Sequence, residues 1–193
     1  MRLFLAVELD ERVRSEAGRV VEILRRRAES SAPRSRLTWV TADRMHLTVR
    51  FIGAVDEERL AELRRVLDPP FETPPFALSV EGSGAFPPKG PPRVLWAGLH
   101  QGRQHLLALE RELTGRLSTI GIPPEDRPYN PHLTLARVRD PAGLRAAALL
   151  DGLHTHTFGH STIDAITLFE SRLSPKGPTY VALARAAFVD RRV

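Results

Sequence analysis

The chain has 193 residues, of which 42% are hydrophobic and 26% charged, a composition typical of a globular protein with one substantial core or two closely packed lobes. No apolar run approaches the roughly 18 residues of a membrane span, and the apolar start is shorter than the h-region of about 7–15 residues in a secretory signal. The lack of cysteine excludes disulfides, thiolate metal sites and cysteine nucleophiles, and a cytoplasmic location is the default expectation.

The positive charge rests almost wholly on arginine. The formal net charge is +5, and the 28 basic residues are 26 arginines with Lys89 and Lys176. Because a planar guanidinium group can grip phosphate with two hydrogen bonds, this balance favours an anionic or nucleic-acid substrate. GC-rich coding also replaces lysine by arginine, so the composition alone leaves both explanations open.

The first half of the chain predicts strands and helices in turn. Segment Arg2–Leu9 is a short apolar run and predicts a strand. Asp10 offers an N-cap for a helix that reaches about Glu29, with an apolar face at Val13, Ala17, Val20, Leu24 and Ala28. Strands are predicted at Leu37–Val40 and Met45–Gly53 around a turn at Thr41–Arg44, and a helix at Asp56–Leu67.

The second half begins with a predicted hairpin, in which Phe76–Ala85 and Val94–Leu99 flank a turn rich in proline and glycine. A helix is predicted from about Gln104 to Leu117, a strand at His132–Val138 and a short helix at Pro141–Leu150. The last predicted strands are Thr162–Leu168 and Thr179–Phe188, around a turn at Pro175–Pro178.

This order of elements favours an α+β fold with a largely antiparallel sheet over a doubly wound parallel sheet, because strands are often adjacent with helices between pairs. The proline clusters are short and are flanked at once by patterned segments, so no linker divides the chain. We therefore expect a single domain over residues 1–193.

A short internal repeat points to the chemistry. His46-Leu47-Thr48-Val49 and His132-Leu133-Thr134-Leu135 match except for one aliphatic exchange and lie 86 residues apart, close to half the chain. On a strand each histidine shares a face with its threonine, while the apolar residues between and after them, Phe51 included, point to the other face. A pseudo-twofold relation between the halves would bring both polar pairs to one cleft.

Two histidines suit the displacement of one oxygen by another at phosphorus. One removes a proton from the nucleophile and the other gives a proton to the leaving oxygen, and an imidazole can do either near neutral pH. A single His-x-Thr triplet is a weak signal, and either histidine alone could be structural. A third triplet, His160-Ser161-Thr162, lacks the central leucine, and we interpret it as structural. The duplication in matching context favours catalysis.

Two other constellations are weaker. His154, His156 and His160 could begin a metal site, but only Asp151 and Asp164 lie near them in sequence, so we expect no metal and no cofactor. Phe86 could form an aromatic wall for a base, although an aromatic residue at a strand end is more often part of the core.

Several further segments accompany the two motifs: Leu37-Thr38-Trp39-Val40, Gly84-Ala85-Phe86-Pro87, Arg93-Val94-Leu95-Trp96, Ala136-Arg137 and Ser174-Pro175-Lys176-Gly177-Pro178-Thr179-Tyr180. In combination they closely resemble the 2H phosphoesterases, and among these the bacterial and archaeal RNA 2′,3′-cyclic phosphodiesterases, long called 2′-5′ RNA ligases. The resemblance covers nearly the whole chain. It implies a two-lobed α+β fold, each lobe an antiparallel sheet with helices outside, around a central active-site cleft.

The resemblance also implies residue roles and an activity, the metal-independent opening of a terminal 2′,3′-cyclic phosphate to a 2′-phosphate with weak, reversible 2′-5′ joining of RNA. His46 would be the proton donor to the leaving oxygen and His132 the proton acceptor from water. Thr48 and Thr134 would hold phosphate oxygens. Arg137 matches the arginine that ends the second motif, although strict alternation places it opposite His132; Arg50, in register with His46, is the arginine that alternation favours.

Two alternatives to this activity stay open. One is a cyclic phosphodiesterase that acts on a small nucleotide, and the other is a non-catalytic RNA-binding module with the same fold. A binding module has no need of two matched proton-transfer groups, whereas basicity serves each alternative equally. The expected partner is RNA with a 2′,3′-cyclic phosphate end or a cyclic nucleotide, and the chain is expected to be a monomer that does not bind membranes.

Overall fold

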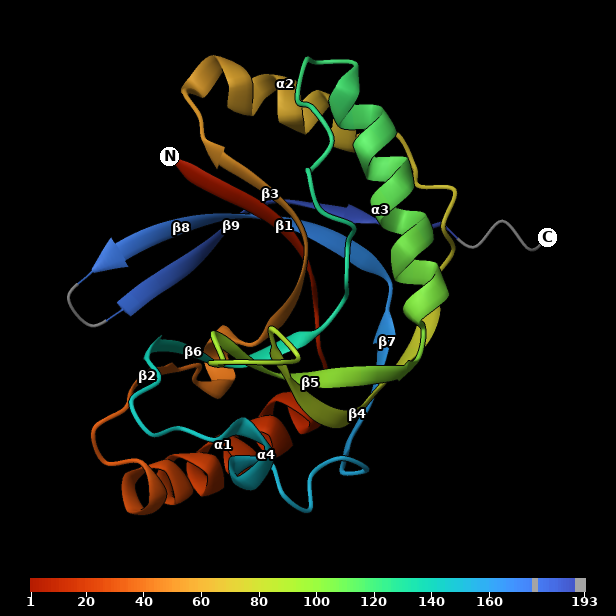
Figure 1. Ribbon diagram of the computed structural model, residues 1–193. Helices are drawn as coiled ribbons and strands as arrows, with labels where there is room; N and C mark the ends of the chain where they lie inside the picture. The colour runs from red at the N-terminus through yellow and green to blue at the C-terminus, as the bar shows by residue number, and fades with distance from the viewer. Residues whose placement is uncertain (175–176, 190–193) are drawn as a thin grey trace.

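The computed structural model describes residues 1–174 and 177–189. Their strands form two antiparallel sheets. The four-stranded sheet has the order β3 (His46–Ala54), β1 (Arg2–Glu8), β8 (Ala165–Ser174) and β9 (Gly177–Ala187). The five-stranded sheet has the order β2 (Arg36–Trp39), β6 (Leu133–Asp140), β5 (Val94–Gln101), β4 (Phe76–Phe86) and β7 (Thr157–Ile163). Figure 1 shows the two sheets one above the other, with helices on their outer sides.

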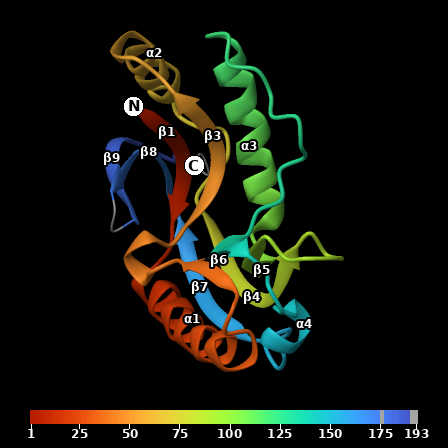
Figure 2. The ribbon, with the colours of Figure 1, turned by 60° about the vertical axis from the view of Figure 1, so that its left-hand side comes forward.

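The helices exchange partners between the two sheets. Helix α1 (Glu11–Ser31) follows β1 of the four-stranded sheet but packs under the five-stranded sheet, beside the short α4 (Ala146–Leu149). Helix α3 (Arg103–Ser118) follows β5 of the five-stranded sheet but packs against β3, beside α2 (Glu57–Leu67). Figure 2 shows the same arrangement from the side. Each sheet is therefore covered by a helix that follows a strand of the other sheet.

The apolar stripes predicted for the helices are buried in the hydrophobic core. In α1 the buried residues are Val13, Ala17, Val20, Val21, Leu24 and Ala28. In α3 they are Leu106, Leu109, Leu113 and Leu117. Asp56 caps α2, because its side chain accepts a hydrogen bond of 2.9 Å from the backbone N–H of Arg59. The predicted α+β fold with two antiparallel sheets is confirmed.

Two predicted elements differ from the structure. The helix predicted at Pro141–Leu150 is reduced to α4, since Gly143 has a φ of 77° and the chain turns there before the helix starts. The strand predicted at Thr162–Leu168 is the junction of β7 and β8, which end and begin on either side of the exposed Asp164. One strand thus becomes two, in different sheets.

The remaining boundaries agree with the prediction to within a few residues. The turn predicted at Thr41–Arg44 contains a short 3-10 helix at Ala42–Arg44. The turn predicted at Pro175–Pro178 includes residues 175 and 176, which lie outside the described residues. None of the helices in the described ranges is long and apolar enough to cross a membrane.

Candidate active site

The two histidine motifs occupy neighbouring strands of different sheets. His46 is the first residue of β3, and His132 immediately precedes β6. Strands β3 and β6 contact each other where the sheets meet. The positive charge of Arg137 lowers the pKa of both His46 and His132. One guanidinium group therefore acts electrostatically on both imidazoles. The two motifs thus lie at one place between the sheets, where the repeat placed them.

A β-bulge follows the threonine in each motif. In β3, Thr48 pairs with Ala6 and Arg50 pairs with Leu5, which leaves Val49 as the extra residue. In β6, Thr134 pairs with Trp96 and Ala136 pairs with Leu95, which leaves Leu135 as the extra residue. The two residues after each threonine are consequently both buried: Val49 and Arg50 in β3, Leu135 and Ala136 in β6.

The bulges correct the predicted positions of both arginines. Arg50 is only 3% exposed, lies 3.7 Å from Glu110 and donates a hydrogen bond to the carbonyl oxygen of Pro123, so it does not line the cleft as strict alternation predicted. The residue after each buried pair returns to the face of its histidine: Phe51 in β3 and Arg137 in β6. Phe51 is 57% exposed and occupies the position in the first motif that Arg137 occupies in the second.

A cavity of about 820 Å³ opens between the sheets beside these residues. Thr48 and Thr134 line it together with His132 and Arg137. Sequence reasoning missed several of its other walls: Phe51 of β3, Arg93 of the hairpin between β4 and β5, and Arg127 and Tyr129 of the loop between α3 and β6. Its cationic side chains suit an anionic ligand, and its aromatic side chains suit a flat ring.

His46 lies in a small aromatic cluster on the cleft face of the four-stranded sheet. Its ring stacks on Phe4 at 4.8 Å and meets the edge of Tyr180 at 5.0 Å between ring centroids. Burial lowers the pKa of His46 to about 4; the charge of Arg137 acts in the same direction, and a hydrogen bond with the backbone of Arg44 opposes the shift. In the free protein at neutral pH, His46 is therefore uncharged.

His132 is oriented by the loop before it. Its Nδ1 lies 2.7 Å from the carbonyl oxygen of Asn130. Because a carbonyl oxygen can only accept, Nδ1 carries the hydrogen and Nε2 is left with a free electron pair. Burial lowers the pKa of His132, the bond to Asn130 opposes this and Arg137 adds to it. The neutral imidazole with a free Nε2 has the form that a general base requires.

The other histidines take part in different contacts. His156 Nε2 lies 2.7 Å from a carboxylate oxygen of Glu16 on α1. In the third triplet, Ser161 is buried and accepts a hydrogen bond of 2.9 Å from the backbone N–H of Asp10, while His160 is exposed. Within residues 1–174 and 177–189 no group of three or more His, Asp or Glu side chains could hold a metal ion.

The model of one protein family, described as LigT-like phosphoesterase, matches residues 12–96 and 99–180, and each matched part contains one His-x-Thr motif. The chain belongs to this family. It is 32% identical over 193 residues to the RNA 2′,3′-cyclic phosphodiesterase of Thermotoga maritima, covering 97% of this chain and 96% of that protein. It is 33% identical over 181 residues to the protein of the same name from Archaeoglobus fulgidus, covering 93% and 96%.

Solved structures show the same family fold. A protein of Thermus thermophilus superimposes with a TM-score of 0.73 at 31% identity, covering 97% of this chain and 98% of the other. E. coli LigT in complex with 3′-AMP superimposes with a TM-score of 0.73 at 24% identity, covering 98% of each chain. The arrangement of two sheets around the cleft is therefore that of the family.

Proposed function

We propose that this chain hydrolyses the 2′,3′-cyclic phosphate at the end of an RNA to a 2′-phosphate, without a metal ion. The observation that carries the proposal is the position of Arg137, whose charge reaches both His46 and His132 and which lines a cavity with Thr48 and Thr134. Two proton-transfer groups and one phosphate-binding group thus share a site. The names of the curated relatives support the same reaction.

In the proposed mechanism the two histidines act on opposite sides of phosphorus. Nε2 of His132 takes a proton from water, whose oxygen attacks phosphorus while the bond to the 3′-oxygen breaks. His46 gives a proton to that 3′-oxygen. Thr48, Thr134 and Arg137 bind the non-bridging oxygens and stabilise the developing charge. The phosphate remains on the 2′-oxygen.

His46 can act as the proton donor only when substrate is bound. A general acid must be protonated, and His46 with a pKa of about 4 is neutral in the free protein at neutral pH. A cyclic phosphate carries a negative charge, and an anion close to an imidazole raises its pKa. The substrate itself therefore supplies the charge that protonates His46, which couples binding to catalysis.

Two related functions follow from the same site. If a 5′-hydroxyl group of RNA attacks in place of water, the same proton transfers join two RNA ends through a 2′-5′ linkage, in a weak and reversible ligation. The cavity of about 820 Å³ would also admit a small cyclic nucleotide alone. Comparison of kcat/KM for an RNA oligonucleotide and for cytidine 2′,3′-cyclic phosphate distinguishes these substrates.

The direct test is hydrolysis in excess chelator. The purified protein is incubated with an RNA oligonucleotide that ends in a 2′,3′-cyclic phosphate, and the product is identified by chromatography against 2′- and 3′-phosphate standards. We expect a 2′-phosphate, and His132→Ala should remove most of the turnover. Loss of activity in chelator that a divalent ion restores would contradict the mechanism. Binding of the RNA without turnover would favour a non-catalytic RNA-binding module.

A further inference from the structure

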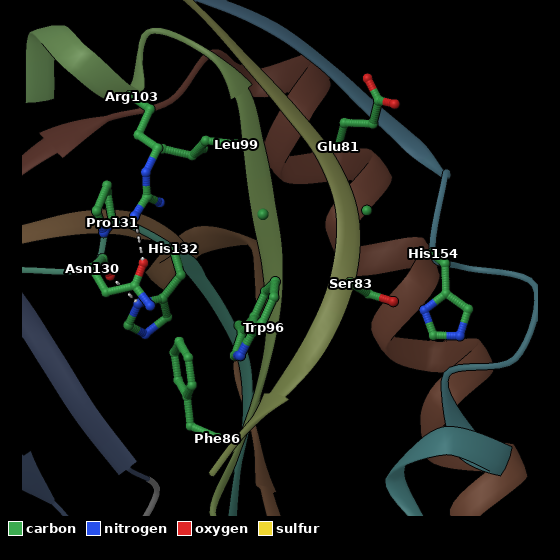
Figure 3. A pocket seen from close by; sticks show the side chains of 12 residues that line it. Glu81, Ser83, Phe86, Trp96, Leu99, Arg103, Asn130, Pro131, His132 and His154 are labelled. Atoms are coloured by element: carbon green, nitrogen blue, oxygen red, sulfur yellow. Dashed lines mark hydrogen bonds between the residues drawn. The ribbon is translucent and has the colours of Figure 1, made fainter. Parts of the chain in front are cut away.

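A second hollow lies next to the large cavity, on the five-stranded sheet. It has a volume of about 320 Å³ and is lined by residues of β4, β5, the start of α3, the loop before β6 and the segment before β7. Three residues, Phe86, Asn130 and His132, line both this hollow and the large cavity. His132 therefore stands on the border between two spaces. Figure 3 shows it near Asn130 and Phe86 in the lining of the smaller one.

The floor of the hollow is aromatic, and glycines on β4 and β5 leave the space that its indole ring occupies. The indole of Trp96 lies so close to Gly84 that a Cβ atom there would be 2.2 Å from the ring. A Cβ at Gly98 would be 2.9 Å from the carbonyl oxygen of Glu81. Phe86 adds a second ring, 5.1 Å from Trp96 between centroids. Such a surface suits the face of a nucleobase.

Polar groups stand at both ends of this aromatic floor. At one end Arg103 donates a hydrogen bond of 3.1 Å to the side-chain oxygen of Asn130. The backbone carbonyl oxygen of Asn130 lies 2.7 Å from Nδ1 of His132. At the other end lie Glu81 and His154 (Figure 3). The hollow thus combines donors, acceptors and flat apolar surface, as a site for a nucleoside requires. Its lining is tied through Asn130 to the base of the proposed reaction.

The position of the hollow indicates which group it holds. In a displacement at phosphorus the nucleophile and the leaving oxygen lie on opposite sides, and the nucleophile lies next to the base. The hollow borders His132, and all of its lining residues come from β4, β5, α3, the loop before β6 and the segment before β7. The large cavity, in contrast, is lined by residues of both sheets, including Thr48 and Phe51 of β3. The hollow is therefore on the side from which the nucleophile enters.

We propose that this hollow binds a nucleoside, or the first nucleoside of an RNA, that presents a free 5′-hydroxyl group to His132 in place of water. This inference rests on the proposed phosphodiesterase function. The 5′-oxygen forms a bond to phosphorus and loses its proton to His132, while the bond from phosphorus to the 3′-oxygen breaks and that oxygen takes a proton from His46. The product is a 2′-5′ phosphodiester, and no other reactant is consumed.

The test measures how the reaction divides between water and the alcohol. A cyclic-phosphate RNA is incubated with increasing cytidine, and the ratio of joined to hydrolysed product is measured in each tube. A bound acceptor makes this ratio saturate with cytidine concentration, whereas glycerol, which has no site, should give a linear dependence. 5′-Deoxycytidine should compete with cytidine without joining and leave the KM for the cyclic phosphate unchanged.

Two matched pairs of variants locate the site. Arg103→Ala should lower the ratio about tenfold, the worth of one hydrogen bond to a charged group, while Arg111→Ala, an exposed arginine on the same helix, should not. Because Arg103→Ala also removes the bond to Asn130, His154→Ala provides a second test against the exposed His160→Ala. The ratio does not depend on the amount of folded protein, since both products come from the same molecules.

The outcomes separate the two proposals. A linear dependence on cytidine, or an unchanged ratio in both Arg103→Ala and His154→Ala, overturns the acceptor site while hydrolysis still stands. Competition of cytidine against the cyclic phosphate, without a joined product, also overturns it, because the nucleoside then occupies the substrate's own position. Absence of hydrolysis by the wild-type protein refutes the proposed function itself.

Discussion

Replacing His46 should change how the stability of the protein depends on pH. The pKa of this imidazole is lowered to about 4 in the folded chain, mainly by burial, from an ordinary value of 6.5. Between these two values the unfolded chain binds a proton that the folded chain does not. Stability must therefore fall as the pH falls through 6.5 towards 4.

The size of the effect follows from the two pKa values. Each tenfold change in proton affinity is worth about 1.4 kcal/mol, so the imidazole removes about 3 kcal/mol of folding free energy by the time the pH reaches 4. His46→Gln cannot bind the proton in either state and should not show this loss. The two proteins share all their carboxylates, so the difference between their pH dependences isolates the histidine.

Urea unfolding between pH 4 and 7.5 measures this difference. The gap in free energy of unfolding between His46→Gln and wild type should shift by about 3 kcal/mol in favour of the variant as the pH falls. His160→Gln, at an exposed position, serves as the control and should follow the wild type. If His46→Gln has the same pH dependence as wild type, the imidazole is not held neutral by its aromatic neighbours and our account of the site is incorrect.

Other predictions concern turnover and the buried arginine. The pH optimum of kcat/KM should lie below 6.5, because burial lowers the pKa of both histidines, and the kcat profile should lie at higher pH because bound phosphate raises them; coincident profiles would count against this coupling. His46→Ala and His132→Ala should each lower kcat by roughly 10²–10⁴-fold, and the double variant by much less than the product of the two; multiplicative losses would show that the histidines act independently. Thr48→Ala and Thr134→Ala should each lower kcat, measured at saturating substrate, by on the order of 10²-fold or less. Arg50→Met should lower the free energy of unfolding by about 3 kcal/mol in urea, because it leaves a partly buried carboxylate without its partner, and an unchanged stability with a raised KM would instead place Arg50 in the cleft.

The elements and the histidine pair were predictable from sequence because local patterns encode them. The stripe at Val13, Ala17, Val20, Leu24 and Ala28 is a property of one helix, and its burial follows from spacing alone. The repeat His-x-Thr likewise identifies two strands and one face of each. These features need no knowledge of which strand pairs with which.

The roles of the arginines were not predictable, because they depend on pairing between distant strands. Strict alternation placed Arg50 in the cleft and Arg137 outside it, and one extra residue in each strand reverses both. A bulge is visible only in the register against β1 or β5. Phe51 and Arg137 nonetheless occupy equivalent positions, each five residues after the histidine of its motif. An alignment of the two motifs beyond their fourth residues therefore places Arg137, and not Arg50, beside Phe51.

The positions of the helices make the two halves of the chain depend on each other. Helix α1 follows β1 of the four-stranded sheet but shields the five-stranded sheet, and α3 follows β5 of the five-stranded sheet but packs against β3 of the four-stranded sheet. Each sheet also takes strands from both halves of the chain. A cut between the two motifs would therefore separate the strands of both sheets and remove each sheet from one of its covering helices, so neither half should fold alone.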